Sequence, residues 1–104
     1  MKKFNFLILI CSVAFMSACE SKTDVVDSGT YQGVIAEVEA EKTEIYVTTG
    51  DGKRLELYFT DSTTLTNSAG IQVPFEELAE GKKVEVTVEK VGKRLDPISV
   101  TILD

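Results

Sequence analysis

Two tyrosines, Tyr46 and Tyr58, are the side chains of this sequence that best suit contact with a ligand. Glu44 lies two residues before Tyr46, so in a strand both side chains would point to the same face. Glu56 and Tyr58 repeat this spacing further along the chain, just after Arg54. Tyrosine suits contact surfaces because it is rigid and amphipathic, while the neighbouring carboxylates disfavour phosphate ligands. The five residues form a candidate binding face for a protein or a sugar, unless they are only cross-strand pairs that stiffen a sheet.

Catalytic chemistry finds little support in the residue types. The chain contains no histidine, which removes the commonest general base and metal ligand. Asp61 and Ser62 are adjacent, but without a histidine to relay the proton we interpret them as part of a polar turn. Paired carboxylates for glycoside hydrolysis would lie on the convex surface of so small a domain. We therefore expect no catalytic residue and no enzyme; an enzyme would need a concave site with perturbed carboxylates.

Metal and anion sites are also weakly indicated. Without histidine or a free cysteine only oxygen ligands remain, which suit calcium or magnesium. Glu37, Glu39 and Glu41 could hold a weakly bound calcium ion, but this spacing is more typical of a solvated strand face. Basic residues that could contact an anionic glycan or headgroup are better explained as an exposed hairpin tip; they are Lys82, Lys83, Lys90, Lys93 and Arg94. We predict no metal site and no cofactor.

Length and charge narrow the class of protein. The 104 residues have room for one small domain, and 43% hydrophobic content is ordinary for a folded chain. The formal net charge is −6, from 17 acidic and 11 basic side chains. Proteins that bind nucleic acid usually carry a basic excess. We therefore expect no nucleic-acid partner.

The first nineteen residues have the three-part organisation of a secretory signal. Lys2 and Lys3 precede an apolar run over residues 4–15, and small residues then lead to Cys19. A transmembrane helix is the alternative, although a span needs about 20 apolar residues. Met16-Ser17-Ala18-Cys19 resembles the lipobox of bacterial lipoproteins, with methionine where leucine is commoner. The resemblance implies that residues 1–18 are a cleaved signal peptide and that Cys19 receives lipid, including an acyl chain such as palmitate.

The lipid on Cys19 would then be the contact with the membrane. Each buried methylene contributes about 0.8 kcal/mol, so two or three acyl chains would hold the protein firmly. Glu20 is not the aspartate that marks inner-membrane retention in enterobacterial lipoproteins, so the resemblance favours the outer membrane. It leaves open whether the domain faces the periplasm or the medium. Residues 19–30 are polar after the cysteine, which predicts a flexible tether, and residues 31–104 form the folded domain.

From residue 31 onward, apolar and polar residues alternate with a period of two, which predicts antiparallel strands with one packed face. The five predicted strands cover residues 34–41, 44–48, 54–59, 84–89 and 98–102. In the first strand the predicted apolar face is Val34, Ala36, Val38 and Ala40, and in the last it is Ile98, Val100 and Ile102.

The turns predict how these strands pair. A three-residue loop over residues 50–52 places apolar residues opposite apolar ones and polar residues opposite polar ones, and it pairs Tyr46 with Glu56. A similar loop over residues 91–93 would pair Val88 with Asp96. Residues 74–81 begin with proline, continue with two acids and end in glycine, which predicts one or two helical turns.

Three strands, a short helix and two strands follow the order of the OB-fold. Scaffold residues support this similarity: Gly33-Val34-Ile35, Thr63-Thr64-Leu65, and Phe75-x-x-Leu78-x-x-Gly81-x-x-Val84-x-Val86. Through them the chain resembles the small OB-fold-like domains of bacterial envelope proteins. We therefore expect an all-β, five-stranded antiparallel OB-like barrel with one short helix between strands 3 and 4. A six-stranded barrel or a small two-sheet sandwich is the alternative.

Together these features suggest a lipid-anchored, non-catalytic binding module of the bacterial cell envelope. Its partner would be an envelope protein or a small ligand, bound through the outer face of strands 2 and 3. The alternative is a structural or stress-related accessory lipoprotein that has no discrete ligand.

Overall fold

The computed structural model describes residues 23–103. The predicted signal peptide and Cys19 lie outside the described residues. Within the described part, no helix has the length and apolar character needed to cross a membrane.

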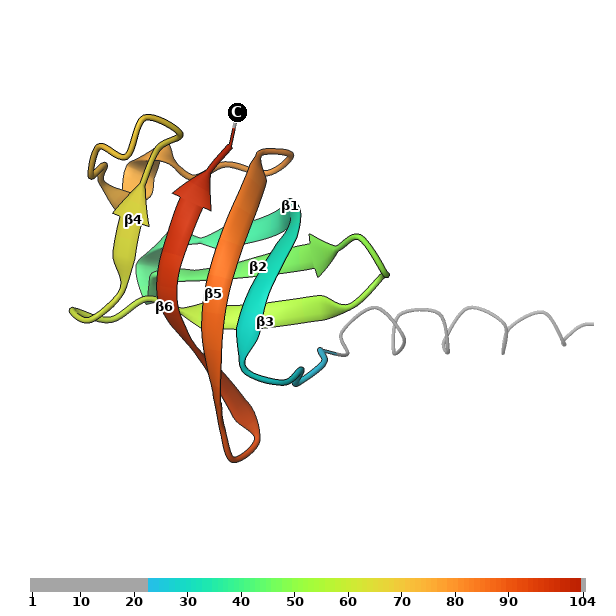
Figure 1. Ribbon diagram of the computed structural model, residues 1–104. Coiled ribbons are helices and arrows are strands. Elements are labelled where there is room, and N and C mark those ends of the chain that lie inside the picture. Colours follow the sequence, from blue (N-terminus) through green and yellow to red (C-terminus); the bar gives the residue numbers. More distant parts are fainter. Residues whose placement is uncertain (1–22, 104) are drawn as a thin grey trace, which may run out of the picture.

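Six strands form one strongly curved sheet, ordered β3-β2-β1-β5-β6-β4. Their bounds are β1 Gly29–Glu39, β2 Glu44–Thr49, β3 Arg54–Tyr58, β4 Thr64–Thr66, β5 Lys83–Val91 and β6 Arg94–Ile102. The sheet curls so that β5 and β6 cross over β2 and β3, with the apolar core between them (Figure 1). All neighbouring pairs are antiparallel except β4 with β6. This architecture confirms the predicted all-β, OB-like barrel.

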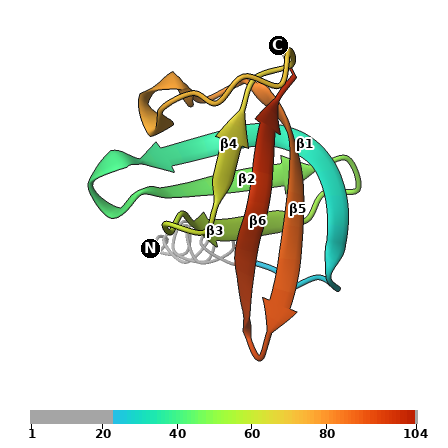
Figure 2. The same cartoon turned by 60° about the vertical axis from the view of Figure 1, so that its left-hand side comes forward.

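Strand β1 joins the two halves of the barrel, as its long curved path in Figure 2 shows. Its first part, from Gly29 to Val34, pairs with β5, and its second part, from Gly33 to Glu39, pairs with β2. Gly33 belongs to both ladders. A Cβ atom at this position would lie 2.4 Å from the backbone oxygen of Thr48. The absence of a side chain at Gly33 therefore allows β1 to bend closely past β2.

The predicted inward face of β1 was wrong at its start. Ile35 is buried, whereas Val34 is 41% exposed and Ala36 is also exposed. The register with β2 shifts between Ile35 and Glu37, so an extra residue interrupts the alternation. After this bulge Val38 packs against the core, as predicted. Alternation could not place Val34 and Ile35 correctly because both neighbours are apolar.

The β2–β3 hairpin has the predicted register. Tyr46 pairs with Glu56, and Glu44 pairs with Tyr58. The backbone N–H of Thr49 donates to Lys53, which encloses the three-residue loop over residues 50–52. Gly52 lies at φ 87°, where glycine is favoured. The candidate binding residues are therefore on adjacent strands.

The β5–β6 hairpin is one residue tighter than predicted. Val91 pairs with Arg94, so the loop contains two residues, and its first residue, Gly92, lies at φ 63°. Val88 consequently pairs with Pro97 rather than with Asp96.

Strand β6 contains a bulge beside Pro97. The partners of Thr87 and Val88 are Ser99 and Pro97, so Ile98 has no partner in β5. Ile98 is 44% exposed, and its predicted place on the inward face was wrong. The bulge turns an apolar side chain outward at the end of the barrel where β3 also ends.

The segment between β4 and β5 contains a single helical turn, of the 3-10 type, over Phe75–Glu77, which is the shorter of the two predicted lengths. Leu78 is buried as predicted, and Phe75 packs edge-on against Phe59 with ring centroids 5.1 Å apart. The sixth strand is β4, which pairs in parallel with β6. Its three residues are too few for alternation to reveal it.

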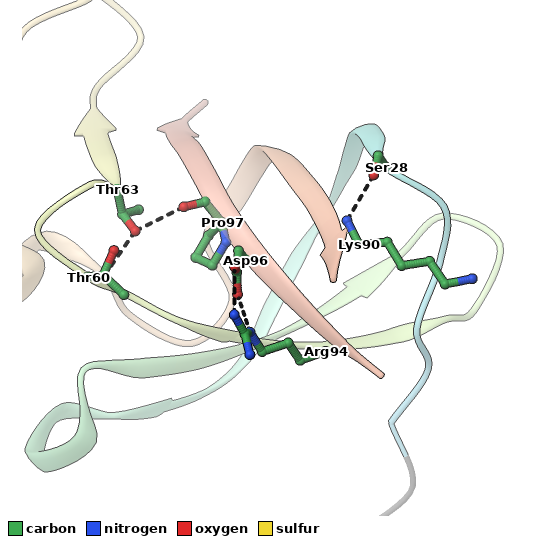
Figure 3. Close-up of polar contacts among 7 residues, drawn as sticks. All are labelled: Ser28, Thr60, Thr63, Lys90, Arg94, Asp96 and Pro97. Atoms are coloured by element: carbon green, nitrogen blue, oxygen red, sulfur yellow. Dashed lines mark hydrogen bonds and ion pairs between the residues drawn. The ribbon is translucent and has the colours of Figure 1, made fainter. Parts of the chain in front are cut away.

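The folded domain begins earlier than the predicted boundary at residue 31. Strand β1 starts at Gly29, and the N–H of Asp24 donates to the backbone oxygen of Arg54 at 2.7 Å. The Ser28 hydroxyl accepts a hydrogen bond from the N–H of Lys90 at 2.8 Å (Figure 3). The described end of the predicted tether therefore lies against the barrel, beside the free edge of β3.

Candidate functional site

All five residues of the predicted binding face come together on the outer face of β2 and β3. The register pairs Tyr46 with Glu56, and Glu44 with Tyr58. Arg54 completes the set from the start of β3. The two tyrosines differ in exposure, since Tyr46 is half-buried and Tyr58 is 48% exposed. The face therefore has an inner half around Tyr46 and an outer half around Tyr58.

The inner half is held by its own contacts. The Arg54 guanidinium carbon lies 4.5 Å from the centroid of the Tyr46 ring, a cation–π distance. An Arg54 side-chain nitrogen donates to Glu37 at 3.2 Å, and the Tyr46 hydroxyl donates to Glu56 at 3.4 Å. Burial and the adjacent Glu44 carboxylate raise the pKa of the Tyr46 hydroxyl, which stays protonated as a donor. Tyr46 is therefore fixed in place.

The Glu44 side chain was predicted to be in contact with water, but the structure buries it. It belongs to the outer face but is only 1% exposed, because neighbouring side chains cover it. Neither carboxylate oxygen makes a hydrogen bond of good geometry within the described residues. Burial favours a raised pKa, but nearby Glu56, Tyr46 and Tyr58 outweigh it and lower the pKa of Glu44. Contact with Glu44 in turn raises the pKa of Glu56. Glu44 therefore carries the negative charge of the pair more readily.

Tyr58 connects this face to a groove. The groove has a volume of about 480 Å³ and lies between the end of β3 and strands β5 and β6. Its lining residues are Tyr58, Thr60, Ser62, Glu89, Arg94, Leu95, Asp96, Pro97 and Ile98. This volume lies within the usual range for ligand sites, about 300–1,000 Å³. Contact with Glu56 and partial burial raise the pKa of the Tyr58 hydroxyl to about 12, so it is neutral at physiological pH.

Short polar contacts hold the groove walls in position (Figure 3). The Thr63 hydroxyl donates to the backbone oxygen of Pro97 at 2.9 Å, which ties the loop after β3 to β6. The same hydroxyl accepts the N–H of Thr60 at 3.0 Å. Arg94 and Asp96, two residues apart on β6, form an ion pair at 2.8 Å along the strand. The groove is thus built from two structured segments that are far apart in the sequence.

Two acids of β1 also belong to the face. The register places Glu37 beside Tyr46 and Glu39 beside Glu44. The sequence indicated both as part of a strand face but not their neighbours, because that requires the β1–β2 pairing. Glu41 is not in β1; it lies in a 3-10 turn, Ala40–Lys42. Strand β1 thus adds two carboxyl groups to the face, and contact with Glu37 raises the pKa of Glu39.

The possible calcium site and the basic cluster do not have the arrangement that a ligand would need in the described part of the chain. Within residues 23–103, no three acidic side chains are arranged to hold a metal ion. Lys82 and Lys83 lie at the opposite end of the nine-residue strand β5 from Lys90, which separates them by about 20 Å. The five basic residues therefore do not form one patch.

Comparisons with known proteins identify the fold class. No protein-family model and no curated protein sequence matches the chain. Solved structures do match, and they define a small OB-like barrel of the kind found in CusF. A tryptophan-to-alanine variant of Escherichia coli CusF with Cu(II) has 13% identity and a TM-score of 0.59, covering 75% of this chain and 94% of that chain. Escherichia coli CusF with Ag(I) has 13% sequence identity and a TM-score of 0.59, and the match covers 82% of this chain and 99% of that chain.

The metals in those structures do not fit the residues of this barrel. Copper and silver sites in proteins draw on imidazole nitrogen and on cysteine or methionine sulfur. The sequence has no histidine, and its two methionines and two cysteines all fall within residues 1–19. The described barrel therefore offers only oxygen donors and cationic nitrogen. The similarity to CusF extends to the fold and not to its metal chemistry.

Proposed function

We propose that the protein is a lipid-anchored, non-catalytic binding module of the bacterial envelope. Its partner, an envelope protein or a small ligand, contacts the outer face of β2 and β3. The observation that carries this proposal is the position of Tyr58, an exposed aromatic residue where the acidic face meets the groove. The contacts of Tyr46 support it, because a preorganised surface loses less entropy on binding.

The groove chemistry supports binding rather than catalysis. Its hydroxyl groups include those of Thr60 and Ser62, but no histidine is available to activate them. Asp96, which could serve as a base, is in an ion pair with Arg94. Glu44, a carboxylate with a lowered pKa, is covered by its neighbours and lies outside the groove lining.

The proposed anchor would hold the site near the membrane. Asp24 is hydrogen-bonded to the edge of β3, and only five residue steps separate it from Cys19. An extended chain of that length spans at most about 18 Å. A lipid on Cys19 would therefore keep β3 close to the headgroups, where a membrane protein or a ligand near the surface could reach it.

Photo-crosslinking in living cells tests the binding role. A photoreactive residue at Tyr58 should form a discrete adduct with a protein partner, and one at Tyr46 should form less because Tyr46 is half-buried. Ile71 is the matched control, since it is 61% exposed in the loop after β4, away from the face. The absence of adducts from both tyrosines in the anchored protein would exclude a protein contact there. Absence of a small-ligand complex as well would favour a structural accessory role.

The anchor has a separate test. Cys19→Ala should move the protein from the membrane fraction to the soluble fraction while leaving the barrel folded. Retention of this variant in the membrane would contradict lipid anchoring through Cys19.

A further inference from the structure

We propose that the outer half of the face, formed by Glu44, Glu56 and Tyr58, binds one organic cation, an ammonium or guanidinium group. This inference rests on the proposed binding function and specifies the chemistry of the partner. The same cationic group can come from a lysine or arginine side chain of a protein or from a small amine.

The inner half of the face shows how such a cation is held. Arg54 lies over the Tyr46 ring and donates to the Glu37 carboxylate. A cation is thus held between an aromatic ring and an acid by contacts within the chain. The outer half has the same kinds of group, a tyrosine ring next to carboxylates. Within the described residues, none of the ion pairs involves Glu44 or Glu56.

Glu44 provides independent evidence that a partner is missing. The residue is 1% exposed, and both of its carboxylate oxygens lack a hydrogen-bond partner in the described part of the chain. A covered carboxylate without a donor is unfavourable, because folding removes water that the protein does not replace. Lys42 favours the charged form of Glu44 but forms no ion pair with it. A bound ammonium or guanidinium group would supply the missing donors.

Tyr58 is the side chain whose movement could give the cation access to Glu44. It lies directly across from Glu44 and is 48% exposed at the end of β3. Its hydroxyl contacts the Glu56 and Glu44 carboxylates but, unlike that of Tyr46, makes no hydrogen bond of good geometry within the described residues. A rotation of the Tyr58 ring toward the groove would uncover Glu44 and present the ring face to the cation. The groove beside it has the volume for the rest of the ligand.

The net charge of the face also favours a cation. On β1, β2 and β3, four carboxylates, from Glu37, Glu39, Glu44 and Glu56, outnumber the guanidinium of Arg54. Lys93 and Arg94 of the β5–β6 hairpin also lie beside Glu56 and Tyr58, and Arg94 is already paired with Asp96. A metal ion is less well supported, because no three of the described acids are arranged to coordinate one. The combination of aromatic ring and carboxylate suits an organic cation.

A nuclear magnetic resonance titration of the full chain in detergent tests this inference. The probes are acetyl-Gly-Arg-Gly-amide, the same peptide with neutral citrulline in place of arginine, n-butylammonium chloride and calcium chloride. We expect the arginine peptide to give saturable shifts at Glu44 and Tyr58, and the citrulline peptide to give none. Tighter binding of the peptide than of n-butylammonium would indicate a polypeptide source, and equal binding a small amine.

Charge-neutralising variants complete the test. Glu44→Gln should weaken binding of the arginine peptide by at least about tenfold, because it removes a charged partner. Glu56→Gln should also weaken it and provides a second variant at a less buried position. Glu85→Gln removes the same charge from β5, away from the face, and should leave affinity unchanged.

Three results would overturn the inference. They are no saturable shift with either organic cation, the same saturable shift with calcium, or an equal loss of affinity in Glu85→Gln. A crosslinked adduct at Tyr58 without cation binding would refute this inference and leave the proposed function standing. Cation binding in the titration, with no crosslinked adduct and no cellular ligand, would refute the proposed function and leave the cation-binding site standing.

Discussion

Gly33 offers a sharp test of how the barrel is assembled. It lies where the two ladders of β1 overlap, and it pairs with Thr49 of β2 and with Val84 of β5. An alanine Cβ would lie 2.4 Å from the backbone oxygen of Thr48 and 2.8 Å from a methyl carbon of Val47. Val47 is fully buried, and the Thr48 oxygen belongs to the backbone, so neither atom can move as a flexible side chain would. Gly33→Ala must therefore push β1 away from β2.

The expected cost lies at the upper end of the range for overpacking, about 3 kcal/mol. A domain of this size has a total stability of about 4–12 kcal/mol, so the loss is a large part of it. The melting temperature should fall by about 12–24 °C, because each kcal/mol corresponds to about 4–8 °C in a small domain. Thermal unfolding followed by far-ultraviolet circular dichroism measures this change.

Gly50→Ala is the matched control. No atom lies within 4 Å of a Cβ built on Gly50, and Gly50 is not among the residues with positive φ. This variant should be neutral or more stable by up to about 1 kcal/mol, because alanine restricts the unfolded chain. If Gly33→Ala melts within about 4 °C of the parent, the junction of β1 and β2 can relax and the argument from close approach fails.

Three further predictions concern the face itself. Tyr58→Ala should abolish the cation contact while changing stability by less than about 0.5 kcal/mol, whereas Tyr46→Ala should cost about 1–2 kcal/mol because Tyr46 packs against Arg54; chemical denaturation of both variants tests the difference. The raised pKa of Glu56 means that its protonated form stabilises the native state, so this contribution is present below the unfolded pKa of about 4.3 and is lost as pH rises through the folded pKa. The melting temperature of Glu56→Gln should therefore decline less than that of the parent as pH rises above about 4.3, and parallel curves would contradict this assignment. Silver(I) should bring no rise in the melting temperature of the barrel, since its described residues lack sulfur and imidazole; a rise that grows with silver concentration would show that a site exists.

The sequence predicted the register of β2 and β3 correctly, because one turn determines it. A loop over residues 50–52 is the choice that keeps apolar residues opposite one another, and it places Tyr46 beside Glu56. The alternation of apolar and polar residues failed to predict burial where neighbouring residues do not differ in polarity. Val34 and Ile35 are both apolar, so their alternation did not reveal which of them is buried. At Ile98, the bulge depends on the pairing with β5 rather than on the local pattern.

The groove was not predictable because no local pattern describes the closure of a barrel. Its walls come from residues 58–62 and from residues 89–98, which meet only when the sheet curls. The covered position of Glu44 has a similar origin. Its cover comes from side chains on neighbouring strands, and alternation indicates only that it belongs to the outer face.

The position of β3 in the sheet explains why the two halves of the face differ. Tyr46 lies on β2, an interior strand, and receives partners from strands on both sides: Glu37 of β1 pairs with it, and Arg54 of β3 stacks on it. Tyr58 lies on β3, at the end of the sheet, where one flank lacks a neighbouring strand. Asp24 is hydrogen-bonded to this flank at Arg54, and the start of β6 lies near Glu56 and Tyr58 without pairing with β3. Side chains on an end strand have fewer partners within the chain, so their remaining capacity for contact is available to a ligand. The same OB-like barrel can therefore serve different ligands, because the core fixes the curvature while the end strand and its groove determine the chemistry.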